Sequence, residues 1–196
     1  MNPVTVITGR CVPLDRSDVD TDQIIPSDWL KRVERTGFGK GLFDEWRENS
    51  DFVLNQERFQ GANVLVAGPN FGTGSSREHA VWALQDYGFD AVISPRFGDI
   101  FRNNALKGGL VPVVAPPEVV ERLLRAIDED HTIEIVVDVE ARRLAVPSLG
   151  IDVEFPLDEF TQYRLVHGLD DIGLTLQHAD DITRYEQTRA TWLPTT

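Results

Sequence analysis

The order of apolar and polar positions along the chain predicts an α/β core in its middle. Between residues 61 and 127, short apolar runs alternate with longer stretches whose apolar residues recur at helical spacing. Continuous runs of four to six apolar residues bounded by Gly or Pro are typical of buried strands. Strands that alternate with helices pair in parallel through right-handed crossovers. We therefore predict strands at 63–67, 91–94 and 110–115, and helices at 80–87, 99–107 and 117–127.

The two ends of the chain have different patterns. Residues 4–14 are rich in β-branched side chains and predict a strand. After Thr132 the apolar runs are short, and 151–155 alternates with a period of two, which is typical of an antiparallel strand. We expect these later strands, at 132–137, 143–146 and 151–155, to form a meander beside a mostly parallel sheet. A helix from Asp158 to Gly168 and a mostly helical extension from about 174 complete a single predicted domain over 1–196.

Residues 15–41 are polar or glycine-rich and predict only turns. Four aspartates lie between residues 15 and 22, but the glycine and glutamate of a calcium loop do not follow them. The simpler interpretation is an Asx-type turn, in which the aspartate side chains accept hydrogen bonds from nearby backbone N–H groups and cap Ile24 and Ile25. A short helical turn at 26–33, capped by Ser27 or Asp28, precedes a glycine-rich loop in which Phe38 is exposed or docks on another element. Four bases between 31 and 40 make either an anion-facing loop or a solvated turn.

Composition and charge exclude several classes of function. The net charge of −13 argues against a nucleic-acid partner, and the chain has no apolar run long enough for a membrane span. No signal peptide is visible, so a cytoplasmic location is expected. Cys11 is the only cysteine, which rules out an iron–sulfur cluster held by this chain alone. The four histidines lack the spacing of a zinc site, so no metal ligands are expected here.

The glycine-rich stretch 70–79 lies between a predicted strand end and a predicted helix start. Unpaired backbone N–H groups and the helix dipole make such a junction favourable for anions. One interpretation is only structural, with Ser75 or Ser76 capping the helix. The sequence has neither the phosphate-loop pattern nor the nucleophile elbow of serine hydrolases.

The same stretch resembles a signature of the aconitase superfamily, found in its mobile, swivelling domain. The fixed positions of that signature are met by Asn70, Gly72, Gly74, Ser75, Ser76, Arg77, Glu78 and His79. The resemblance extends to 20–26, 30–32, 96–104 and 108–112. Because the chain lacks the cluster cysteines and carries Gln23, it is most similar to the free-standing small subunits of isopropylmalate dehydratases. The resemblance implies a swivelling β/β/α three-layer fold.

The resemblance also implies a reaction, in which 2-isopropylmalate loses water to give an isopropylmaleate and water returns to give 3-isopropylmalate. Ser75 corresponds to the base that takes the proton. The matching substrate-binding positions are Ser76, Arg77, Gly74, Lys31, Arg32, Asp22, Gln23 and Thr36. His79 is expected to pack rather than catalyse.

A separate large subunit is implied as the partner. It would carry a [4Fe–4S] cluster, while this chain binds no cofactor. Two alternatives remain open at this stage. One is a related dehydratase acting on homocitrate, citramalate or a substituted maleate, and the other is a non-catalytic module that binds dicarboxylates.

Overall fold

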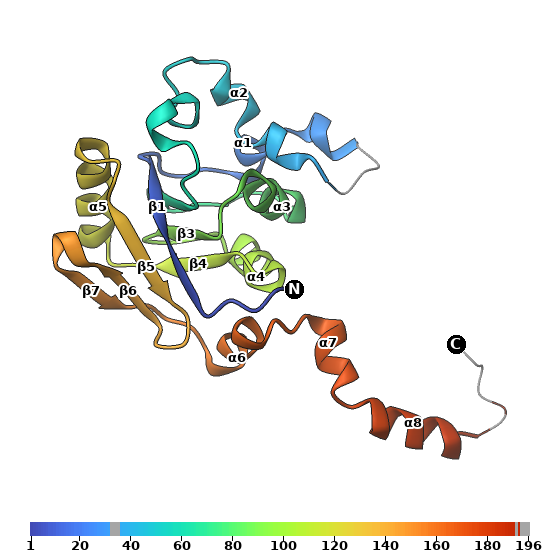
Figure 1. Cartoon of the computed structure of the whole chain (residues 1–196). Helices are drawn as coiled ribbons and strands as arrows, with labels where there is room; N and C mark the ends of the chain where they lie inside the picture. Colours follow the sequence, from blue (N-terminus) through green and yellow to red (C-terminus); the bar gives the residue numbers. More distant parts are fainter. Residues whose placement is uncertain (32–35, 191, 193–196) are drawn as a thin grey trace.

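Seven strands form one sheet in the order β4-β3-β2-β1-β5-β6-β7 (Figure 1). They are seen in a computed structural model that describes residues 1–31, 36–190 and 192. The strands, in chain order, are β1 (Val6–Leu14), β2 (Val64–Ala67), β3 (Ala91–Ser94), β4 (Val111–Val114), β5 (Glu134–Asp138), β6 (Arg143–Val146) and β7 (Ile151–Glu154).

The first strand joins a parallel half of the sheet to an antiparallel half. β1 pairs in parallel with β2, with Cys11 opposite Val64, and antiparallel with β5, with Val6 opposite Asp138. β2, β3 and β4 continue in parallel, whereas β5, β6 and β7 form an antiparallel meander. The predicted α/β class, with parallel core strands and added antiparallel strands, is confirmed.

Helices cover both faces of the parallel half. Helices α3 (Glu78–Tyr87) and α4 (Asp99–Gly108) lie on one side of the sheet, and α5 (Pro117–Glu129) lies on the other (Figure 1). This double cover explains why every residue of β2 and β3 is buried and apolar or small. The helix α5 turns Leu123 and Ile127 toward the sheet and leaves Glu121 and Arg125 exposed.

The predicted helix ends are confirmed, because both glycines that follow α3 and α4 adopt left-handed backbone conformations. Gly88 has φ +118° and Gly109 has φ +86°, and each donates its N–H to a carbonyl of the last helical turn. The start of α4 after Gly98 is also as predicted.

The segment between β1 and β2 consists of short helical turns. These are α1 (Thr21–Ile24), η1 (Ser27–Lys31), η2 (Phe38–Gly41), α2 (Asp44–Arg47), η3 (Val53–Asn55) and η4 (Glu57–Phe59), where η marks a 3₁₀ helix. Another 3₁₀ helix, η5 (Pro147–Leu149), lies between β6 and β7. The turn predicted from residue 26 is the 3₁₀ helix η1, and its predicted end at Val33 lies outside the described residues.

The chain ends in three helices, α6 (Glu159–His167), α7 (Asp171–Leu176) and α8 (Ala179–Thr188). Asp158 caps α6 as predicted, since its side chain accepts a hydrogen bond from the Thr161 N–H. Helices α7 and α8 lead away from the sheet (Figure 1). Within the described residues, no helix has the length and apolar character needed to cross a membrane.

The buried face of α5 generates the first prediction. Replacing Leu123 by Ala should lower the free energy of unfolding by about 2–5 kcal/mol, because it leaves a cavity under a fully buried side chain. Replacing the exposed Glu121 by Ala should change it by less than about 0.5 kcal/mol. Urea unfolding followed by circular dichroism measures both, and equal losses would contradict the assigned orientation of the helix.

Candidate active site

The glycine-rich loop lies at the carboxyl end of β2 and is held by backbone hydrogen bonds to the segment that follows β1. Gly72 and Thr73 donate their N–H groups to the Val19 carbonyl, at 2.7 and 3.2 Å, and Thr21 donates its N–H to the Thr73 carbonyl, at 2.9 Å. Ligands of open α/β sheets bind at this end of parallel strands. The loop therefore occupies a position where a rigid scaffold presents functional side chains.

Two glycines let the loop approach its neighbours closely. Gly72 has φ +75°, and a Cβ there would overlap the ring of Phe101. A Cβ on Gly98 would overlap the Gly72 carbonyl oxygen. Phe71 and Phe97 lie beside this contact, and the Phe71 and Phe101 rings meet edge to face at 5.3 Å. The loop is thus seated on a buried aromatic cluster.

Ser75 and Ser76 are exposed and are not helix caps. Helix α3 begins at Glu78, and Arg77 is its N-cap residue, with no side-chain capping hydrogen bond. The interpretation that one of the serines caps the helix is therefore wrong, because the helix starts one residue too late for Ser76 and two residues too late for Ser75. Among the described residues neither serine hydroxyl makes a hydrogen bond, so both are available to a ligand.

Arg77 is held by Asp22 and has one nitrogen left over. Its Nη2 lies 2.7 Å from Asp22 Oδ1, and the side chain is 18 % exposed, compared with 53 % for Asp22. Its Nη1 is buried and has no hydrogen-bond partner in the described part of the chain. A buried donor without an acceptor costs about 1–3 kcal/mol, so this nitrogen favours a bound anion.

The segment carrying Asp22 is ordered by its own capping box. The Asp20 side chain accepts from the Gln23 N–H at 2.8 Å, and Gln23 Oε1 accepts from the Asp20 N–H at 3.0 Å. This places Gln23 in a structural pair, while its predicted contact with substrate stays a prediction. The expected turn chemistry around the aspartates is confirmed as the cap of α1.

Sequence reasoning missed Thr21, which is almost fully buried. Its hydroxyl donates to the Ser75 carbonyl at 2.9 Å and thereby fixes the backbone next to the two serines. The D-x-x-Q spacing of Asp20 and Gln23 is a capping-box signal that predicts a helix starting at Thr21. This signal places Thr21 at the start of a helix, but it does not predict that the residue is buried.

Of the other predicted binding residues in the described part of the chain, Gly74 belongs to the loop itself, whereas Lys31 and Thr36 make no contact with it that would bring them there. Lys31 Nζ lies 2.7 Å from Asp28 Oδ1 on the surface, where pairing raises the pKa of Lys31 and lowers the pKa of Asp28. Thr36 is exposed, and Gly74 is exposed with φ +88°. Arg32 lies outside the described residues.

His79 packs between aromatic rings, as expected. Its ring centroid lies 5.2 Å from that of Phe38 and 4.7 Å from that of Trp82. Phe38 is buried, so the glycine-rich segment η2 docks on the first turns of α3. The Gly39 N–H also donates to Asp86 on the same helix, at 2.9 Å. These contacts connect the basic segment, residues 31–40, to α3, the helix that follows the glycine-rich loop.

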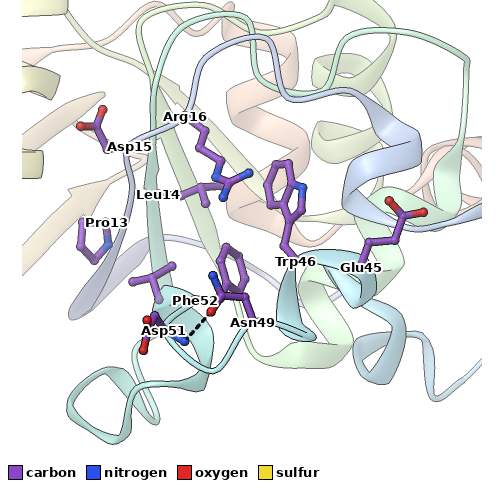
Figure 2. Close-up of a pocket in the computed structure, with 10 residues that line it drawn as sticks. Pro13, Leu14, Asp15, Arg16, Glu45, Trp46, Asn49, Asp51 and Phe52 are labelled. Atoms are coloured by element: carbon purple, nitrogen blue, oxygen red, sulfur yellow. Dashed lines mark hydrogen bonds between the residues drawn. The ribbon is translucent and has the colours of Figure 1, made fainter.

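A separate cavity of about 440 Å³ lies between the end of β1 and the segment α2–η3 (Figure 2). Within it the Arg16 guanidinium lies 4.1 Å from the centre of the Trp46 ring. Its lining contains none of the residues predicted to bind substrate or catalyse. It is therefore distinct from the site at the glycine-rich loop.

The residues of this chain do not fit an iron–sulfur cluster. Cys11 is fully buried inside β1, and burial raises the pKa of its thiol, which disfavours the thiolate that a cluster requires. No group of three His, Cys, Asp or Glu side chains able to hold a metal is present among the described residues.

The capping box generates a prediction for the site. Replacing Asp20 by Ala should lower the free energy of unfolding by about 0.5–2 kcal/mol, because it removes the cap of α1. Replacing Asp15 by Ala, an exposed aspartate earlier in the same turn, is the matched control and should cost less than about 0.5 kcal/mol. Thermal unfolding measures both, and identical midpoints would contradict the role of the cap.

Comparison with known proteins agrees with this geometry. The aconitase C-terminal domain family matches residues 1–118, and the family of C-terminal domains of 3-isopropylmalate dehydratase small subunits matches residues 171–196. A 3-isopropylmalate dehydratase small subunit from Parafrankia sp. is 63% identical over 196 residues, covering 100% of both chains. One from Rubrobacter xylanophilus is 57% identical over 194 residues, covering 99% of this chain and 98% of that protein.

A solved structure extends the comparison to a distant relative. The crystal structure of 3-isopropylmalate dehydratase from Methanocaldococcus jannaschii superimposes with a TM-score of 0.67 at 25% identity, covering 91% of this chain and 98% of that one. The high identity over full length, the two family matches and the shared fold lead to one conclusion. The chain belongs to the family of 3-isopropylmalate dehydratase small subunits, within the aconitase superfamily.

Proposed function

We propose that this chain and a separate large subunit together form the hydro-lyase that interconverts 2-isopropylmalate and 3-isopropylmalate through isopropylmaleate. The observation that carries the proposal is the unpaired, buried Nη1 of Arg77, two residues from the exposed hydroxyl of Ser75. A substrate with carboxylates needs a fixed cation, and its dehydration needs a base beside that cation.

Ser75 is the proposed base. In the first half of the reaction Ser75, as its alkoxide, takes the proton of a C–H bond while the C–O bond on the adjacent carbon breaks, giving the alkene and a hydroxide ion. The proton on Ser75 and this hydroxide together make up the water that is lost, and in the second half both return to the alkene with the opposite regiochemistry. A serine hydroxyl is a poor base unless nearby positive charge stabilises its alkoxide. The start of α3 and the Arg77 guanidinium supply such charge.

Arg77 is the proposed clamp for one substrate carboxylate. Asp22 occupies its Nη2 and so restricts the orientation of the guanidinium, which leaves Nη1 without an acceptor of its own. An arginine held in this way donates in a fixed direction, which a lysine does not. Ser76 and the exposed backbone at Gly74 complete the proposed binding set around Ser75.

The basic segment is the proposed contact for the rest of the substrate. Lys31 already binds a carboxylate, that of Asp28, at the surface. We propose that Lys31, Arg32, Thr36 and Gln23 contact the second carboxylate and its neighbouring groups when the complex closes. The docking of Phe38 against His79 supports this, because it ties the segment to the helix that begins at the loop.

The partner is proposed to be the large subunit, with the [4Fe–4S] cluster on that chain. The names of the relatives describe small subunits, which supports a two-chain enzyme. The single buried cysteine supports a cluster outside this chain. A cytoplasmic location remains part of the proposal.

Two other functions are compatible with the sequence motifs alone. Neither a related dehydratase for homocitrate, citramalate or a substituted maleate nor a non-catalytic dicarboxylate-binding module has a specific observation in its favour. The full-length similarity to 3-isopropylmalate dehydratase small subunits favours the isopropylmalate reaction.

Reconstitution tests the function and the base together. The chain alone should not dehydrate 2-isopropylmalate, and addition of the large subunit should produce the alkene, measured by its ultraviolet absorbance. Replacing Ser75 by Ala should lower kcat by about 10²–10⁴-fold, the usual contribution of a positioned base. Replacing the exposed Ser148 by Ala should leave kcat unchanged. Turnover like that of the wild type in the Ser75 variant would eliminate it as the base.

The carboxylate clamp has its own test. Replacing Arg77 by Lys keeps the charge but removes the fixed pair of donors, so kcat/KM should fall about 10–100-fold, equivalent to one or two charge-assisted hydrogen bonds. Steady-state kinetics of the reconstituted enzyme measure this change. Replacing Arg125 by Lys on the exposed face of α5 is the control. An unchanged kcat/KM in the Arg77 variant would exclude the clamp.

A further inference from the structure

The last two helices expose large apolar side chains that the body of the protein does not cover. We call residues 171–188, which comprise α7 and α8, the C-terminal arm. Ile172 and Leu176 are 70 % and 64 % exposed, and Ile182 and Tyr185 are 38 % and 63 % exposed. No residue of α7 or α8 is buried. Exposed apolar side chains gathered in one segment mark an interaction surface.

The spacing of these residues gives each helix an apolar side. Ile172 and Leu176 are four residues apart on α7, and Ile182 and Tyr185 are three apart on α8, so each pair shares one face. In α8 the polar residues Asp181 and Arg184 form an ion pair of 2.9 Å on the remaining surface. This is the pattern of an amphipathic helix that docks its apolar side in a groove.

The first half of the arm is attached to the body, and Gln177, between α7 and α8, donates its Nε2–H to the Tyr163 hydroxyl of α6 at 3.3 Å. Asp171 lies 2.9 Å from Arg164 and 4.0 Å from Lys107, which fixes the first turn of α7 beside α6 and α4. From there α7 and α8 lead away from the sheet (Figure 1). The arm is therefore not folded back over the sheet, and its apolar side chains stay uncovered.

Charge and area disfavour a second copy of this chain as that neighbour. The arm carries four acids and one base (−3), which leaves −10 for the rest of the chain, so copies repel one another. The four apolar side chains present on the order of 400 Å², so two arms packed on each other fall short of the roughly 1,200–2,000 Å² of a stable interface. The arm fits better as one part of a larger interface.

The family matches point to which interface this is. Residues 1–118 match a domain family named as the C-terminal domain of aconitase, whereas residues 171–196 match a family named for the dehydratase small subunit. The arm thus belongs to the version of this fold that exists as its own subunit. In a single-chain enzyme a covalent linker would keep this domain beside its partner. A separate subunit has to be held there by non-covalent contacts instead.

We infer that the C-terminal arm docks on the large subunit, inserting the apolar side of α8, with Ile182 and Tyr185, into an apolar groove bordered by basic residues. This inference rests on the proposed function, because it names the large subunit as the partner. The groove's basic border is expected from the net negative charge of the arm.

The test uses the full-length chain with both anchors replaced, Ile182→Ser together with Tyr185→Ser. Serine matches isoleucine and tyrosine in helix propensity, so the helix itself should persist. The control carries Thr183→Ser and Gln187→Ser on the other side of α8. Affinity for the purified, cluster-bearing large subunit of the same organism is measured by biolayer interferometry without oxygen. Thermal unfolding checks that the body is intact.

The anchor variant should bind the large subunit at least about 10-fold more weakly than the wild type, as expected for losing two buried apolar side chains. The control should stay within about twofold of the wild type, and turnover of the anchor variant should recover at saturating large subunit. These results would support the arm as a docking element.

Two results would overturn the inference while leaving the proposed function intact. One is equal affinity of the wild type and the anchor variant in an active enzyme. The other is a wild-type chain that sediments as a dimer, an anchor variant that sediments as a monomer, and unchanged affinity for the large subunit. Failure of the wild type to bind or activate the large subunit would overturn the proposed function, and this inference with it.

Discussion

The backbone hydrogen bonds between 19–21 and 72–73 are the contact on which the proposed site depends. They join the segment after β1 to the loop after β2, two regions about fifty residues apart in sequence. The Thr21 hydroxyl adds a side-chain hydrogen bond, to the Ser75 carbonyl. Because these bonds involve the main chain, they position the loop without using the side chains of Ser75, Ser76 and Arg77. Those side chains stay available for chemistry, whereas Gly72 is required by its close contact with Phe101.

The functional side chains of the site and the group that orients them come from different segments. The loop supplies the serines and Arg77, while the preceding segment supplies Asp22, which orients the guanidinium. The capping box of α1 keeps Asp22 in place. The two charged groups of the site, Arg77 and Asp22, therefore come from the two segments that these backbone hydrogen bonds join.

Much of the fold could be predicted from the sequence, and the two failures have different causes. The strands β2 and β3 and the helix stops at Gly88 and Gly109 follow from local patterns, since burial on both sheet faces and left-handed caps leave clear signals. The start of α3 was misplaced, because a serine before a helix is a cap by preference, not by necessity. The burial of Thr21 depends on a contact across the fold, which no local pattern encodes.

The central place of β1 in the sheet has a consequence for how the chain reaches its folded state. β1 is made first, yet one of its edges pairs with β5, so Val6 has to find Asp138 after most of the chain has been synthesised. Pairings this distant in sequence slow folding and leave an edge strand open meanwhile. A chain that leaves the ribosome before β5 has paired would expose the unpaired backbone edge of β1 to other molecules.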